Sequence, residues 1–149
     1  MIAEISTIMK TTPELLWKEI TRPQSLQYVA APILYFTPKE DTEFHENWEI
    51  NKEYNLKLFL FKVLPLGSHK IVLRKIDPSA KKIISKESGA LAKVWNHTIT
   101  FHAINSGQIK YTDIIEIKAG LLTPLIWLFS HIFYRHRQRR WKRLLAKKI

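Results

Sequence analysis

The chain has 149 residues, 46% of them hydrophobic, and it carries 24 Lys and Arg against 13 Asp and Glu, for a net charge of +11. Cysteine is absent, which excludes a disulfide framework and thiolate chemistry and favours the reducing cytoplasm. The four glycines do not form a dinucleotide or phosphate loop, so we expect no cofactor. The first ten residues lack the regions of a signal peptide, which also favours the cytoplasm. We expect one domain over residues 1–149.

The first quarter of the chain predicts a strand, two short helices and a second strand. Residues 2–9 show the period of two that is typical of a strand. A threonine followed by a proline favours a helix start, and the predicted helix covers residues 13–20. A second helix over 24–30 ends ahead of a proline, and the apolar run 33–36 returns to strand.

The rest of the chain predicts an antiparallel meander followed by one long helix. Turn residues recur at intervals of about ten residues, which favours hairpins over alternating strands and helices. A single helix of about 26 residues begins with the apolar segment 121–133, and it would cover the exposed face of the sheet. The candidate strands cover residues 47–50, 54–63, 68–76, 82–87, 93–103 and 108–118.

The order of elements and several short segments resemble the START-like, Bet v 1-like (SRPBCC) superfamily, in its ligand-binding, polyketide cyclase-like branch. The segments are LGSH at 66–69, ESG at 87–89, WNH at 95–97, YTD at 111–113 with AG at 119–120, and RHRQRRW at 135–141. The resemblance covers nearly the whole chain. It implies an α+β helix-grip fold, in which a curved antiparallel sheet of about seven strands surrounds the long C-terminal helix, with two short helices after the first strand. It also implies an apolar cavity between sheet and helix.

Side-chain alternation indicates which residues face that cavity. In strand 93–103 one face carries apolar residues together with His97, and in strand 108–118 one face carries apolar residues together with Asp113. A hairpin closed by a three-residue loop, with Gly107 in the left-handed conformation, would oppose Ile99 to Asp113 and place His97 diagonally across from Asp113. A shift by one residue would put Asp113 opposite the outer face, so the pattern excludes it.

A histidine and a carboxylate on an apolar face must find partners, since burying an unpaired charge is costly. They could form a satisfied structural cluster, orient a ligand in an apolar pocket, or act as an acid–base pair in a cyclase-like enzyme. The pattern leaves the facing of Glu87 and His69 undecided. The candidate ligand-binding residues are Trp95, His97, Tyr111, Asp113, Glu87, His69, Trp48, Phe101, Leu125 and Phe129, and the candidate catalytic residues are His97 and Asp113.

The predicted helix ends in a basic segment with eight Lys and Arg between residues 135 and 148 and no acid. This segment could be a solvated helix end, or it could contact the headgroups of an anionic membrane. The apolar run before it is too short to span a bilayer. The basic residues surround the helix without a nucleic-acid motif, which argues against nucleic acid as a partner. The candidate contacts with an anionic surface are Arg135, Arg137, Arg139, Arg140, Lys142 and Arg143.

The six histidines do not form a metal-binding set. His97 and His102 point to opposite faces of one strand, and His131 and His136 diverge on one helix. We therefore expect no metal. The leading hypothesis is a cytoplasmic protein that binds an apolar small molecule or lipid.

Overall fold

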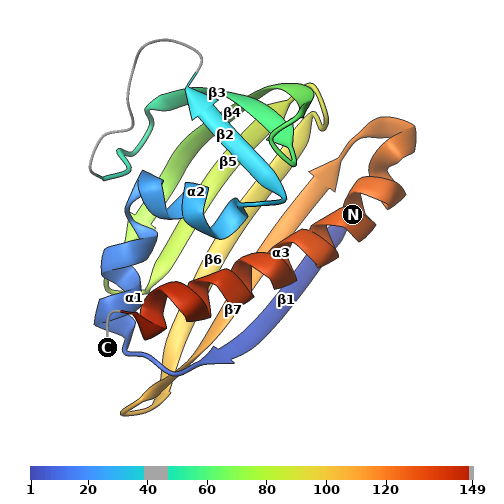
Figure 1. Cartoon of the computed structure of the whole chain (residues 1–149). Coiled ribbons are helices and arrows are strands. Elements are labelled where there is room, and N and C mark those ends of the chain that lie inside the picture. Colours follow the sequence, from blue (N-terminus) through green and yellow to red (C-terminus); the bar gives the residue numbers. More distant parts are fainter. Residues whose placement is uncertain (39–46, 148–149) are drawn as a thin grey trace.

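The computed structural model describes residues 1–38 and 47–147. Its seven strands form one antiparallel sheet in the order β1-β7-β6-β5-β4-β3-β2, and the sheet curves around the long helix α3 (Figure 1). The strands are β1 (Ile2–Met9), β2 (Leu34–Pro38), β3 (Glu53–Leu60), β4 (Leu64–Asp77), β5 (Lys82–Gly89), β6 (Val94–Asn105) and β7 (Gln108–Lys118). The predicted α+β architecture is confirmed.

The helices begin where the local sequence favours helix starts. α1 (Pro13–Ile20) begins with proline at its first turn, and the hydroxyl of Thr12 accepts a hydrogen bond of 3.3 Å from the amide of Leu15. α2 (Pro23–Ala30) follows at once. The short 3₁₀ helix η1 (Gly120–Leu122) leads into α3 (Thr123–Ala146).

α3 lies across the concave face of the sheet and packs on β1, β7 and α2 (Figure 1). Its buried side chains recur every three or four residues, so they form one face of the helix. The buried positions include Phe133, Tyr134, Arg137, Gln138, Trp141 and Leu145. No helix of the described ranges has both the length and the hydropathy that a membrane span requires.

The predicted register of β6 and β7 is confirmed: Ile99 pairs with Asp113 and His97 pairs with Ile115. The predicted left-handed conformation of Gly107 is wrong, since the left-handed glycines of the described chain are Gly67 and Gly120. The register instead shifts between Ala103 and Asn105, and that irregularity absorbs the extra residue before the turn.

The strand predicted at 47–50 is wrong. Within this segment Ile50 forms an isolated bridge, with Leu73, and the next residue, Asn51, has a φ of 62°. The amide of Trp48 donates to the backbone oxygen of Thr21 at 3.0 Å, so this segment is bound to the end of α1 instead of extending the sheet.

β4 begins at Leu64, four residues before its predicted start. The chain turns at Phe61 and Lys62, both of which have positive φ, and this turn ends β3 at Leu60. The turn therefore covers residues 61–63, whereas the sequence pattern predicts it at residues 64–67.

Candidate ligand-binding cavity

A cavity of about 80 Å³ lies between the concave face of the sheet and α3. This volume is several times the ~10–15 Å³ that one water molecule needs. Most of its wall is aliphatic or aromatic, and the residues come from β2 to β6, from the loops before β3 and after β5, from the end of α1 and the residues that follow it, from α2 and from α3. The apolar wall includes Leu26, Leu34, Phe36, Trp48, Leu58, Ile71, Leu73, Ile83, Trp95, Ile99, Phe129, Phe133 and Trp141.

One polar cluster joins the cavity wall to the core. Nε2 of His97 lies 2.7 Å from Oδ1 of Asp113, and His97 itself lines the cavity. Asp113 is fully buried, and it also accepts hydrogen bonds from the Tyr111 hydroxyl at 3.0 Å and from Nε2 of Gln138 at 2.9 Å. Gln138 donates to the backbone oxygen of Ile5 as well, so this cluster ties α3 to β1 and β7. Burial and the adjacent Asp113 carboxylate hold the pKa of Tyr111 well above its usual value.

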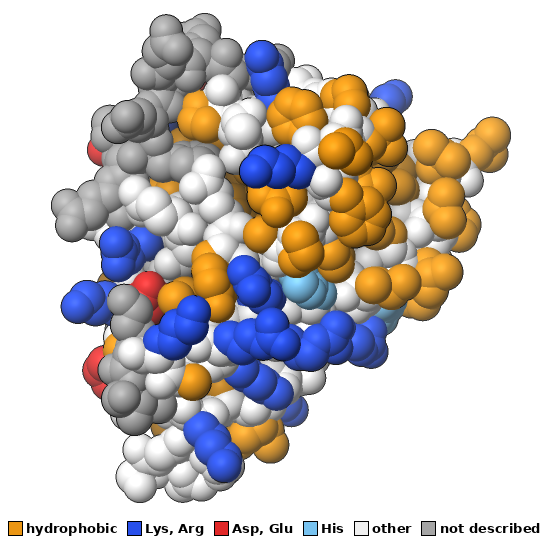
Figure 2. Space-filling view, viewed as in Figure 1, with side chains coloured by type: hydrophobic (Ala, Val, Ile, Leu, Met, Phe, Trp, Pro, Cys, Tyr) orange, Lys and Arg blue, Asp and Glu red, His pale blue; other side chains and the backbone are white. Residues whose placement is uncertain are grey.

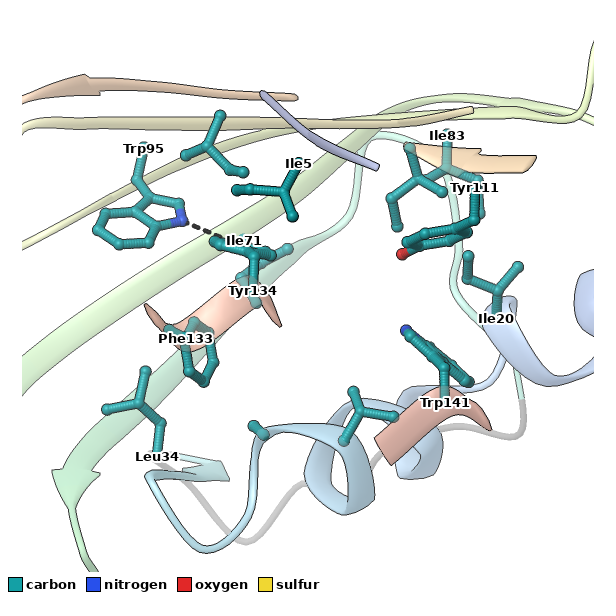
Figure 3. Close-up of a cluster of buried hydrophobic side chains, with 14 of the residues drawn as sticks. Ile5, Ile20, Leu34, Ile71, Ile83, Trp95, Tyr111, Phe133, Tyr134 and Trp141 are labelled. Carbon is teal, nitrogen blue, oxygen red and sulfur yellow. Dashed lines mark hydrogen bonds between the residues drawn. The ribbon is translucent and has the colours of Figure 1, made fainter. Parts of the chain in front are cut away.

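A tyrosine and a tryptophan connect α3 to β6. Nε1 of Trp95 donates to the Tyr134 hydroxyl at 2.9 Å, and Figure 3 shows the two side chains pointing toward one another from the sheet and the helix. The ring centroids of Tyr134 and His97 are 4.8 Å apart. Burial raises the pKa of Tyr134 above its ordinary value, so its hydroxyl stays protonated at neutral pH.

A second polar cluster lies on β4 and β5. Nε2 of His69 lies 2.9 Å from Oε1 of Glu87, and the Ser85 hydroxyl donates to Oε2 of Glu87 at 2.5 Å. All three residues line the cavity. Burial raises the pKa of Glu87, but the hydrogen bond and charge of His69, with His97 and Ser85, outweigh burial and leave the pKa below its ordinary value. Glu87 is therefore a carboxylate at neutral pH.

Arg137 also lines the cavity, which corrects its predicted place on the basic surface. It is only 6% exposed, because it projects from the buried face of α3, one turn after Phe133 and one turn before Trp141. Burial lowers its pKa, but Tyr134, Asp113, Tyr111 and Glu87 outweigh burial and raise it, so the guanidinium is a cation.

Six of the ten predicted ligand-binding residues line the cavity: Trp95, His97, Glu87, His69, Trp48 and Phe129. The other four lie elsewhere. Tyr111 and Asp113 are fully buried behind His97. Phe101 packs in the core with its ring centroid 6.2 Å from that of Trp17, and Leu125 is 63% exposed on the outer side of α3.

Four cavity residues of α3 are absent from the ligand-binding set predicted from the sequence: Phe133, Tyr134, Arg137 and Trp141. Phe133, Arg137 and Trp141 recur every four residues, the spacing of one helix face, and they follow Phe129 at the same spacing. Tyr134 lies beside Phe133 on the same buried face. This spacing could have indicated a buried helix face, but the many arginines around residue 137 favoured a solvated surface instead.

The remaining basic residues of α3 lie at the surface. Arg135, Arg139, Lys142 and Arg143 are exposed, and the guanidinium of Arg140 lies 4.0 Å from the ring centroid of Tyr28. Lys148, the last of the eight basic residues, lies outside the described residues. Figure 2 shows a band of Lys and Arg beside a patch of hydrophobic side chains on this face.

The arrangement can bind an apolar molecule and offer it polar groups at a few points. His97, hydrogen-bonded to a carboxylate, could also exchange a proton with a bound molecule. Over residues 1–38 and 47–147, no three His, Asp or Glu side chains gather in a way that could hold a metal ion.

A protein-family model described as "Domain of unknown function (DUF8410)" matches residues 7–145 of the chain. The chain belongs to the DUF8410 family. No curated protein matched it.

Solved structures show the same fold as this DUF8410 chain. Protein CV1439 from Chromobacterium violaceum superposes with a TM-score of 0.75 at 12% identity, and the match covers 97% of this chain and 96% of that one. A START superfamily protein from Mycobacterium smegmatis has a TM-score of 0.70 at 8% identity, covering 99% of each chain. Ara h 8.0201 has a TM-score of 0.68 at 12% identity, covering 99% of this chain and 98% of that one. The fold is therefore START-like and Bet v 1-like, as predicted.

Proposed function

We propose that this DUF8410 chain binds an apolar small molecule or lipid in the cavity between its sheet and α3. The observation that carries the proposal is the cavity of about 80 Å³, lined by mostly aliphatic and aromatic side chains. Ligand sites are commonly concave and mostly apolar, with a few polar groups that orient the ligand. The absence of cysteine favours the cytoplasm as the place of action.

The polar contacts that we propose for the ligand are His97, His69 and Glu87, with Trp48, Trp95 and Phe129 as apolar contacts. His69 and Glu87 already bind each other, and His97 already binds Asp113. These groups already have hydrogen-bond partners without a ligand, so their role would be to orient the ligand.

Filling the cavity tests the proposal. Ile83 lines the cavity, while its neighbour Ile84 points to the opposite face of β5. We expect Ile83→Phe to weaken binding of the neutral dye Nile red about tenfold or more, since ~1.4 kcal/mol of lost contact has this effect. Ile84→Phe is the matched control and should bind as the wild type does. Equal affinity in all three proteins would show that the dye binds elsewhere and would contradict the proposal.

A second candidate function is contact with an anionic membrane, because the outward face of α3 changes from apolar to basic along its length. Leu125, Leu128 and Ile132 are each more than half exposed and lie at helical spacing. Arg135 and Arg139 continue the same spacing. An exposed apolar row beside a basic row complements a surface of anionic headgroups above acyl chains.

Vesicle sedimentation distinguishes this candidate. We expect the protein to sediment with vesicles of phosphatidylcholine and phosphatidylserine and much less with phosphatidylcholine alone. The double variant Arg135→Gln/Arg139→Gln should bind at least tenfold more weakly, at about 1 kcal/mol per charge, and Leu125→Ser/Leu128→Ser should also lose binding. The control is Lys110→Gln, an exposed lysine on β7. Sedimentation that no helix variant changes would contradict a membrane role for this face.

A further inference from the structure

Arg137 is a cation inside an apolar cavity, and its side chain has no hydrogen bond to another of the described residues. It is 6% exposed, and its Nε is buried with no hydrogen-bond partner among the described residues. The guanidinium carbon lies 5.0 Å from the ring centroid of Tyr134 and 5.9 Å from that of Phe133. Contacts with aromatic faces stabilise the charge but accept none of its five N–H groups in the way an oxygen does.

The nearby carboxylates do not satisfy Arg137. Glu87 accepts from His69 and Ser85, and Asp113 accepts from His97, Tyr111 and Gln138. Within the described part of the chain, no carboxylate oxygen lies within 4.0 Å of the Arg137 guanidinium. Both carboxylates act on Arg137 only at longer range.

The other arginine of the cavity, Arg22, also has a buried Nε without a hydrogen-bond partner among the described residues, but it differs in exposure and in its contact with a carboxylate. The side chain of Arg22 is 38% exposed, and its guanidinium lies 3.9 Å from Oε2 of Glu19. Arg22 therefore reaches water and has a carboxylate partner at the rim. Arg137 is almost fully buried and has no carboxylate partner among the described residues. The structure therefore presents it as the cation that a bound molecule would meet inside the cavity.

We propose that Arg137 binds an acidic group of the ligand, so that the ligand is an apolar molecule with a carboxylate at one end. The inference rests on the proposed function. A planar guanidinium matches a carboxylate through two parallel hydrogen bonds, and a buried charge is strongly disfavoured unless it is paired. The carboxylate would lie against α3, away from Glu87 on β5, and the apolar part would contact the aliphatic side chains of the sheet.

A matched pair of probes tests this inference by isothermal titration calorimetry. Octanoate and octanamide have nearly the same shape, but only octanoate is charged. We expect the wild type to bind octanoate at least about tenfold more tightly than octanamide, because hydrogen bonds between charged groups are the stronger ones. Arg137→Met should remove this preference and still bind octanamide, which also shows that the variant is folded.

Two further variants complete the test. Arg139→Met makes the same substitution on the exposed side of α3 and should keep the wild-type preference. Arg137→Lys retains the charge but lacks the planar guanidinium, so it should keep part of the preference for octanoate. Equal binding of both probes by the wild type, or an octanoate preference that survives Arg137→Met, would overturn the role of Arg137 and leave the cavity proposal standing. Binding of neither probe would count against both proposals.

Discussion

Nε2 of His97 lies 2.7 Å from Oδ1 of Asp113, with the histidine in the cavity wall and the carboxylate fully buried behind it. Asp113 also accepts hydrogen bonds from Tyr111 and Gln138, so three donors from β6, β7 and α3 meet at one carboxylate. Asp113 thereby fixes the orientation of the imidazole that faces a bound molecule. We infer that Asp113 positions His97 and does not itself touch the ligand.

Asp113→Ala should destabilise the protein strongly. The substitution leaves three buried donors without their acceptor, and removing one partner of a buried charge network costs about 3–5 kcal/mol. Urea unfolding measures the loss. Glu116→Ala, on the same strand and facing outward with Asn96 as its partner, should cost less than about 1 kcal/mol. Similar losses in the two variants would contradict the positioning role of Asp113.

His97→Ala separates binding from catalysis. If His97 only orients the ligand, we expect the variant to bind a co-purified molecule more weakly and to leave it chemically unchanged, as the wild type does. A cyclase-like enzyme predicts instead that the wild type converts a bound polyketone and that His97→Ala abolishes this conversion. The control is His102→Ala, on the exposed outer face of the same strand. Conversion by the wild type, followed by mass spectrometry, would contradict a pure binding role.

Glu87 should make stability depend on pH in the acid range. Its folded-state pKa lies below the ordinary value of 4.5, because the effects of His69, His97 and Ser85 exceed that of burial. The ionised carboxylate therefore stabilises the fold above about pH 4.5, and this contribution is lost as the pH falls through the lower folded-state pKa. Glu87→Gln should flatten the fall in unfolding free energy over this window, measured by urea titration at each pH.

The control for this titration is Glu53→Gln, because the Glu53 side chain is 61% exposed and lies 3.7 Å from Lys70. We expect its pH profile to follow the wild type. A wild-type profile for Glu87→Gln would mean that Glu87 has the same pKa in the folded and unfolded chain, and would contradict the proposed effect of His69.

Gly89 keeps β4 and β5 close beside the His69 and Glu87 pair. A Cβ atom at Gly89 would collide with the backbone oxygen of Ser68 and lie 3.1 Å from Nδ1 of His69. We expect Gly89→Ala to lower the melting temperature and to cost about 1–3 kcal/mol, as overpacking does. A Cβ atom at Gly107 would meet no atom within 4 Å, so Gly107→Ala is the control. An unchanged melting temperature in Gly89→Ala would show that the strands can separate at no cost.

Side-chain alternation was sufficient to predict the environment of His97 and Asp113, because a period of two fixes the face and excludes the odd registers. The same reasoning could not decide Glu87 or His69, whose strands lack clear alternation at those positions. Their pairing depends on the register of β4 and β5, which shifts between Leu73 and Lys75. The strand predicted at 47–50 failed because Trp48 binds the backbone at Thr21, a contact between distant segments that no local pattern contains.

For Arg137 the local sequence pattern was informative but was not used. Its helical spacing from Phe133 and Trp141 was present in the sequence, but a basic segment favours a solvated surface, and this general preference concealed the buried face. The cavity itself depends on the distance between sheet and helix, which the sequence pattern does not specify.

Native mass spectrometry of the freshly purified protein, followed by solvent extraction, tests the central claim most directly. We expect one defined apolar molecule bound in a one-to-one ratio, released on denaturation and reduced in amount in Ile83→Phe. An empty protein that also fails to bind Nile red would contradict a ligand-binding function.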